Sequence, residues 1–262
     1  MVVLDTLGDA VSLLRRRPTL FGYLVALGLV GNLLGSGHHF GLSEFGQKLL
    51  ARASIVVGPA VTVGVLDLVN RAVVHDRVSF DVVVNAGVRN YLRVVGVSLL
   101  LAFGGGIAVI LLLVVLPAQL ALVVCLVAIA AAALVFQFAD LAIVLEGETP
   151  RDAMRRSYDV ATSNFGPVLG YTVLEVPFGL LHGATFVERS ELEGILVTVT
   201  PDSTPLTFGI LAVGTVGWAV LQTYRVVFYR ALVASDGDGQ TGRDSAGGHD
   251  VTAARTDGES VP

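Results

Sequence analysis

The chain has 262 residues, of which 53% are hydrophobic and only 15% are charged. Because soluble domains are about 45–50% apolar and about 25% charged, this composition excludes an ordinary water-soluble protein and indicates a membrane protein. The formal net charge of -5 lies mostly in residues 235–262, and the basic residues elsewhere do not gather into a patch of the kind that binds nucleic acid.

Six apolar segments reach or approach the roughly 20 residues that a helix needs to cross a bilayer. Arg52 interrupts the second segment and Glu175 the fifth. Only Pro117 and Ala118 separate the third from the fourth, which predicts a tight hairpin, although periodicity alone also allows one very long helix. The six segments are residues 19–37, 49–69, 94–116, 119–141, 167–183 and 206–228.

A repeated unit organises these segments. Asp9, Asp81 and Asp152 recur at intervals of about 72 residues, and each opens an amphipathic, arginine-bearing stretch followed by two apolar segments. Apolar and polar residues alternate in these stretches at helical spacing, which predicts helices lying flat at the lipid headgroups. The predicted fold is therefore all-α, a polytopic bundle of six transmembrane helices in three units, each an interfacial helix plus two spans.

Two of the interfacial helices have a capping pattern at their start. Thr6 precedes Asp9 by three residues, and Thr149 precedes Asp152 in the same way, with Pro150 between them. A threonine oxygen accepts from an unpaired amide in the first turn, and a carboxylate there favours the positive end of the helix. The spacing predicts helix caps at both positions.

The domain boundaries follow from the repeats and the change in composition near the end. The predicted membrane domain covers residues 1–234, with repeats at about 5–76, 77–148 and 149–234. Residues 235–262 are acidic, rich in Gly, Ser and Thr, and contain almost no large apolar side chain. Such a segment cannot bury enough surface to offset the entropy of ordering, so we expect a disordered cytoplasmic tail.

The basic residues predict the orientation. Fourteen arginines fall on the side of the repeat starts, and only Lys48, Arg52 and Arg189 fall on the other. The positive-inside rule then predicts a multi-pass protein of the cell membrane with both termini in the cytoplasm. Arginines near an anionic leaflet contribute about 1 kcal/mol each to headgroup attraction, although charge-based orientation alone also explains them. The candidate headgroup contacts are Arg89, Arg93, Arg155 and Arg156.

Glu175 is the strongest candidate for a functional residue. It lies near the centre of the fifth predicted span, where a carboxylate is costly and marks a transport, proton or ligand site by default. A protonated Glu175 that is hydrogen-bonded to a neighbouring helix is the structural alternative.

Asp67 and Asp140 occupy matching places near the ends of the second and fourth predicted spans, and Tyr224 and Arg225 take that place in the third repeat. We expect both aspartates in structural ion pairs with arginines of the adjoining interfacial helix, Asp140 with Arg155 or Arg156. A paired-aspartate protease is not favoured by their flanking residues.

No pattern points to an enzyme, a metal site or a cofactor. His38, His39, His182 and Glu44 lack a ligand spacing of the H-E-x-x-H kind, and Cys125 is the sole cysteine. We therefore expect no catalytic residues, metal or cofactor.

The residues around the fourth span resemble a known group of proteins. The run from Phe136 through Asp140 and Pro150 to Ser157, with Asn164 and Phe165, resembles uncharacterised six-span membrane proteins of haloarchaea. Those proteins are similar in turn to the membrane domain attached to some bacterial glycerophosphoryl diester phosphodiesterases. The single lysine, the arginine excess and the acidic tail fit a halophilic source. The resemblance implies no phosphodiesterase activity, because the catalytic domain does not match any part of this chain.

These observations favour an integral membrane protein without a catalytic site, with a membrane-organising, lipid-binding or partner-binding role. The expected partners are membrane lipids and other membrane proteins, not nucleic acid. The alternative is a small transporter or exporter that uses Glu175.

Overall fold

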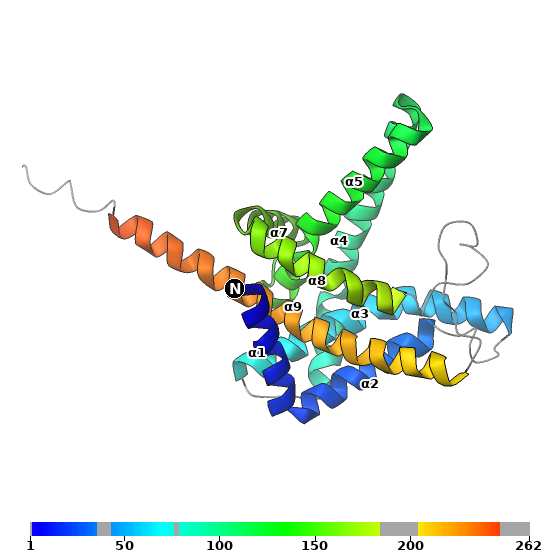
Figure 1. Ribbon diagram of the computed structural model, residues 1–262, viewed down its shortest axis with the longest axis horizontal. Helices are drawn as coiled ribbons and strands as arrows, with labels where there is room; N and C mark the ends of the chain where they lie inside the picture. The colour runs from blue at the N-terminus through cyan, green and yellow to red at the C-terminus, as the bar shows by residue number, and fades with distance from the viewer. Residues whose placement is uncertain (1, 36–42, 76–78, 184–203, 247–262) are drawn as a thin grey trace, which may run out of the picture.

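A computed structural model describes residues 2–35, 43–75, 79–183 and 204–246, and these residues are helical with no strand among them (Figure 1). The all-α prediction is confirmed. The helices are α1 Val2–Arg16, α2 Pro18–Gly35, α3 Glu44–His75, α4 Phe80–Val115, α5 Ala118–Phe136, α6 Ala139–Leu141, the π-helix η2 Ala142–Glu146, α7 Pro150–Ser163, α8 Phe165–Gly183 and α9 Thr204–Ala246.

Three helical segments of the described chain are long and apolar enough to cross a membrane: Val56–His75, Val83–Val115 and Gln119–Glu146. α4 and α5 form a hairpin that turns at Pro117 and projects away from the other helices (Figure 1). Large apolar side chains along this hairpin are exposed; Val114, for instance, is 79% exposed. Burying such surface in lipid is strongly favourable, so the composition and the hairpin both indicate a membrane protein.

The core lies around the middle of α9, from Thr215 to Leu232, where this helix packs against α1, α2, α3 and α8. Its centre is aromatic. The ring centroids of Tyr171 and Phe228 are 4.9 Å apart, and those of Phe138 and Tyr229 are 5.7 Å apart. Aromatic pairs at these distances add to the stabilisation from burial alone. The cluster therefore ties α8, α9 and the segment after α5 together.

The interfacial segments of the first and third repeats form separate helices, α1 and α7, whereas that of the middle repeat does not. α4 runs without interruption from Phe80 to Val115, so the predicted interfacial helix and the third span are one helix. The physical difference is at the junctions. Pro18 starts α2 after α1, and Asn164 ends α7, but no breaker follows Arg93.

The two predicted caps have opposite outcomes. At α7 the Thr149 hydroxyl accepts from the Asp152 amide at 3.4 Å and Pro150 takes the first helical position, which confirms the prediction. The cap at Thr6 is wrong, because α1 already begins at Val2. Thr6 lies inside that helix, and its hydroxyl donates to the Val2 carbonyl at 2.7 Å.

α9 extends beyond the last predicted span as far as Ala246, and so enters the segment expected to be a disordered tail. A helix propagates more readily than it nucleates, so one anchored in the core continues into a polar segment at little cost. Residues 247–262 lie outside the described chain.

Candidate functional site

The fourth predicted span is broken near its C-terminal end. α5 stops at Phe136, α6 begins at Ala139, and the π-turn η2 leads to Gly147, whose φ of 78° is one that glycine adopts without strain. A break frees backbone amides and carbonyls, which at membrane depth require partners. Breaks and π-turns of this kind are frequent at functional sites.

Ser157 of α7 satisfies two of the freed groups. Its hydroxyl accepts from the amide of Phe138 at 3.2 Å and donates to the carbonyl of Val135 at 2.7 Å. Ser157 is fully buried, and the small neighbours Ala153 and Ala161 let α7 approach closely. The buried face of α7 therefore follows these small side chains, and Tyr158, the next residue along the helix, is 52% exposed.

Arg225 of α9 satisfies a third group. Its Nη2 donates to the carbonyl of Gln137 and, at 2.7 Å, to the carboxylate of Asp140. The same carboxylate oxygen accepts from the amide of Leu141 at 2.9 Å. The Arg225 and Asp140 side chains are only 15% and 18% exposed, so the break is closed by a largely buried ion pair.

Both aspartates predicted to be structural are thus ion-paired, but not with the expected partners. Asp140 binds Arg225 from the third repeat instead of Arg155 or Arg156, and Arg156 pairs with Glu146 at 3.3 Å. Asp67 pairs with Arg71 on its own helix at 3.1 Å, four residues along. A partner one turn away on the same helix is reached without any tertiary contact.

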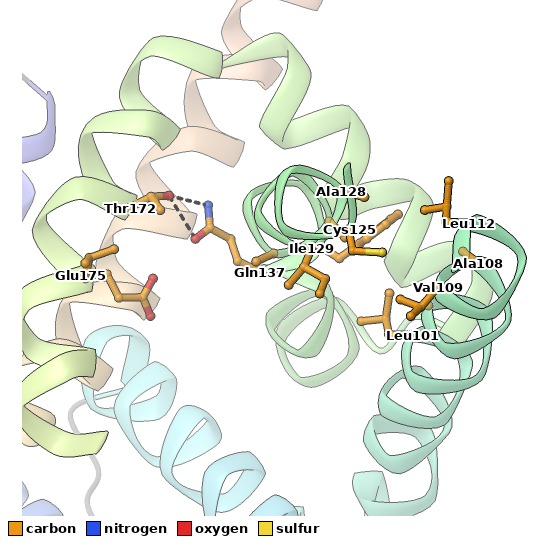
Figure 2. A pocket seen from close by; sticks show the side chains of 15 residues that line it. Leu101, Ala108, Val109, Leu112, Cys125, Ala128, Ile129, Gln137, Thr172 and Glu175 are labelled. Carbon is orange, nitrogen blue, oxygen red and sulfur yellow. Dashed lines mark hydrogen bonds between the residues drawn. The ribbon is translucent and has the colours of Figure 1, made fainter. Parts of the chain in front are cut away.

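Glu175 lies on α8 beside this cluster. It shares a helix face with Tyr171 and Thr172, and its carboxylate interacts electrostatically with Arg225 and Asp140. The Gln137 amide nitrogen donates to the Thr172 hydroxyl oxygen at 3.3 Å, which joins the break to α8. Figure 2 shows this pair, with the Glu175 carboxylate pointing from α8 toward α5.

A pocket of about 850 Å³ opens beside these residues, between α4, α5 and α8 (Figure 2). Gln137, Thr172 and Glu175 form its polar end. The rest of the lining is apolar, apart from the thiol of Cys125. Small-molecule sites of about 300–1,000 Å³ with apolar walls and a few convergent polar groups are common in helical proteins. The apolar walls comprise Leu101, Gly105, Ala108, Val109 and Leu112 of α4, Ala128, Ile129, Ala132, Ala133 and Phe136 of α5, and Val176 of α8.

A family model described as a domain of unknown function (DUF7847) matches residues 1–232. The chain belongs to the DUF7847 family. The match covers every residue of the DUF7847 pocket and stops shortly before the acidic tail. It confirms the part of the predicted resemblance that placed the chain in a family without an assigned function. No curated protein and no solved structure matches the chain.

The remaining predicted residues of the DUF7847 domain lie on its surface or outside the described chain. Arg89, Arg93 and Arg155 are exposed, and Arg93 donates to the Gly147 carbonyl at 3.1 Å. Among the described residues no three His, Cys, Asp or Glu side chains gather closely enough to hold a metal ion. The histidines considered above as metal ligands are not among these residues, because His38, His39 and the side chain of His182 lie outside the described part of the chain.

Glu175, the residue singled out from the sequence, lines the pocket, whereas the groups around it were not predicted. Gln137 and Thr172 are ordinary polar residues in the sequence, and no proline or glycine marks the break at Gln137. The one signal that pointed here was the matching position of Asp140 and Arg225 in successive repeats.

Proposed function

We propose that this chain crosses the cell membrane six times as three repeats, with both termini and the arginine-rich repeat starts in the cytoplasm. Each predicted span falls largely within one helix, apart from the broken fourth. In Figure 1, α1 and α7 lie on one side, and α2, α8 and the first half of α9 run away from that side. The near absence of lysine and the run from Phe136 to Ser157 support a haloarchaeal source and kinship with the phosphodiesterase-linked membrane domain.

Single-cysteine labelling tests this orientation. In a Cys125→Ser background, Ser12→Cys, Asn85→Cys and Thr162→Cys should react with a membrane-impermeant thiol reagent only after the cells are permeabilised. Pro117→Cys should react in intact cells, because it lies at the exposed hairpin tip. Labelling of Asn85→Cys from outside while Thr162→Cys stays protected would contradict the repeat.

We further propose a non-catalytic role, in which the protein binds a lipid or lipid-like molecule between α4, α5 and α8. One observation carries this proposal: the pocket has apolar walls and one polar end, which is the polarity pattern of an amphiphile. The exposed Arg89, Arg93 and Arg155 add a surface for anionic headgroups at the inner leaflet. Arg156 contributes less there, since Glu146 already engages it.

Filling the pocket should abolish binding. Ala132 lines the pocket, whereas Ala130, on the same helix, is exposed and does not line it. Ala132→Trp places an indole where the ligand would lie, and we expect it to remove a co-purifying lipid-like molecule that native mass spectrometry detects on the wild-type protein. Ala130→Trp adds the same side chain outside the pocket and should retain it. Equal retention by both variants would exclude the pocket as the binding site.

A transporter or exporter that uses Glu175 is the second candidate. The observation that favours it is the broken helix beside an intramembrane carboxylate, since discontinuous helices form substrate sites in many transporters. A proton-coupled or cation-coupled flux in proteoliposomes that Glu175→Gln abolishes would favour transport over binding alone.

A further inference from the structure

The charges around the pocket narrow the class of ligand. Asp140 and Arg225 neutralise each other behind the polar end of the pocket, with Oδ1 of Asp140 2.7 Å from Nη2 of Arg225. Within the described part of the chain, Glu175 has no basic side chain within salt-bridge distance, and none of the fifteen lining residues is Lys, Arg or His. The ionised polar end therefore carries one uncompensated negative charge, in a setting where charge is weakly screened.

The hydrogen-bonding groups narrow the class further. An ionised carboxylate only accepts hydrogen bonds. The amide nitrogen of Gln137 already donates to the hydroxyl oxygen of Thr172, and that hydroxyl lies 2.9 Å from the carbonyl of Val168, one turn back, as donor to acceptor. The polar end thus offers mainly acceptor capacity, which suits a head group that donates.

The apolar walls indicate a chain in place of a compact ring. The lining of α4 runs from Leu101 to Leu112 and that of α5 from Cys125 to Phe136. Eleven residues of helix rise about 17 Å, so the two walls form a long apolar slot beside one short polar end.

We propose that the pocket binds a single-chain amphiphile with a protonated amine head group, its alkyl chain between α4 and α5 and its ammonium against Glu175. This inference rests on the proposed binding role and names its ligand. The ammonium donates to the carboxylate and supplies the missing positive charge, and charge-assisted bonds of this kind are stronger than neutral ones. The titratable groups that interact electrostatically with Glu175 are Tyr171 on α8, Asp140 on α6, and Arg225 and Tyr224 on α9, and the lining adds only the thiol of Cys125 at the far end of the α5 wall. α4 contributes no titratable side chain to the lining.

Photolabelling in lipid nanodiscs tests the inference. Three diazirine probes share one dodecyl chain and differ in the head group: an amine, an alcohol and a carboxylate. Labelling is scored by mass spectrometry on α4 and α5 alone, so that replacing Glu175 does not alter the count. Because a hydrogen bond to a charged group is worth a factor of about ten or more, we expect the amine to label about tenfold more than the alcohol, and the carboxylate least.

Two variants and a pH series test whether Glu175 causes the preference for the amine probe. Glu175→Gln should bring the amine-to-alcohol ratio close to one, while Asp159→Asn, which removes an exposed carboxylate of α7, should leave it at about ten. Lowering the pH protonates Glu175 but leaves the amine charged, so in the wild-type protein the ratio should fall as the pH falls. This series needs no variant and stands even where Glu175→Gln fails to fold.

The outcomes separate this inference from the function on which it rests. Equal labelling by all three probes, lost in Ala132→Trp, would overturn the amine specificity and leave the binding role intact. Stronger labelling by the carboxylate would also overturn the specificity. No labelling of the wild-type protein above the level in Ala132→Trp would overturn both proposals.

Discussion

Asp140→Asn should lower the free energy of unfolding by about 3–5 kcal/mol, the usual cost of removing one partner from a buried ion pair. The reason is the environment of Arg225, whose side chain is only 15% exposed and bonds both to Asp140 and to the carbonyl of Gln137. Loss of the Asp140 charge leaves the guanidinium buried without its counter-charge. Fluorescence of Trp218, the sole tryptophan, reports unfolding in a denaturant titration.

Asp67→Asn is the matched control. The Asp67 side chain is even more buried than that of Asp140, at 6% against 18% exposed, but its partner Arg71 is 44% exposed and is free to turn toward water once the charge is gone. We expect a loss of about 1 kcal/mol or less, as for exposed pairs. Equal losses from the two substitutions would show that the Arg225 pair is not desolvated as described.

A double substitution separates the charge from the hydrogen bond. Asp140→Leu together with Arg225→Met removes both charges, and buried pairs replaced in this way often regain most of their stability. Here the recovery should be incomplete, because the carbonyl of Gln137 then has no donor, at a cost of about 1–3 kcal/mol. Full recovery would mean that Arg225 is not needed to satisfy the break.

The sequence predicts the elements better than it predicts how they meet. Apolar length and composition locate the apolar parts of α2, α4, α8 and α9, and the chemistry of Pro117 and Thr149 places a hairpin and a cap. These are local effects, which a few neighbouring residues determine. The continuity of α4 from Phe80 to Val115 was not predicted, because amphipathic periodicity alone does not reveal whether a helix continues into the next span.

The candidate site depends on contacts that no local pattern specifies. Glu175 was predictable, because a carboxylate at membrane depth is costly anywhere. The pairing of Asp140 with Arg225 joins positions 85 residues apart, and the role of Ser157 depends on a break that leaves no mark in composition. The predicted pairing of Asp140 with Arg155 or Arg156 was wrong because it relied on proximity along the chain, whereas the partner in the structure, Arg225, belongs to the third repeat.

Glycine packing shows the same limit. The four-residue spacing of Gly31 with Gly35 and of Gly166 with Gly170 predicts close helix contacts. A Cβ at Gly170 would indeed lie 3.2 Å from a side-chain carbon of Val3 on α1, but a Cβ at Gly31 or Gly166 meets nothing within 4 Å. The closest approach is instead at Gly64 of α3. Small-residue spacing shows where a helix is able to approach a neighbour, but the tertiary arrangement decides which glycines are used.

Gly64→Ala should therefore destabilise the protein by about 1–3 kcal/mol, the usual cost of overpacking, and Gly64→Leu by more. A Cβ at Gly64 would lie 2.4 Å from the carbonyl oxygen and 2.9 Å from the Cα of Val83, so α3 and α4 must move apart as backbones. One turn away along both helices, a Cβ at Gly87 would lie 2.9 Å from the carbonyl oxygen of Ala60. Both contacts involve backbone atoms, so no side-chain rotation relieves either of them.

Gly58→Ala, on the same helix, is the control that separates packing from helix propensity. A Cβ there meets nothing within 4 Å, so the substitution should be neutral or stabilising by up to about 1 kcal/mol, the helix preference of alanine over glycine. The Trp218 titration should thus show a loss of stability for Gly64→Ala and no loss for Gly58→Ala, six residues away on the same helix. The close crossing of α3 and α4 requires this difference, because propensity alone would move both in the same direction. Stabilisation by Gly64→Ala would contradict the crossing.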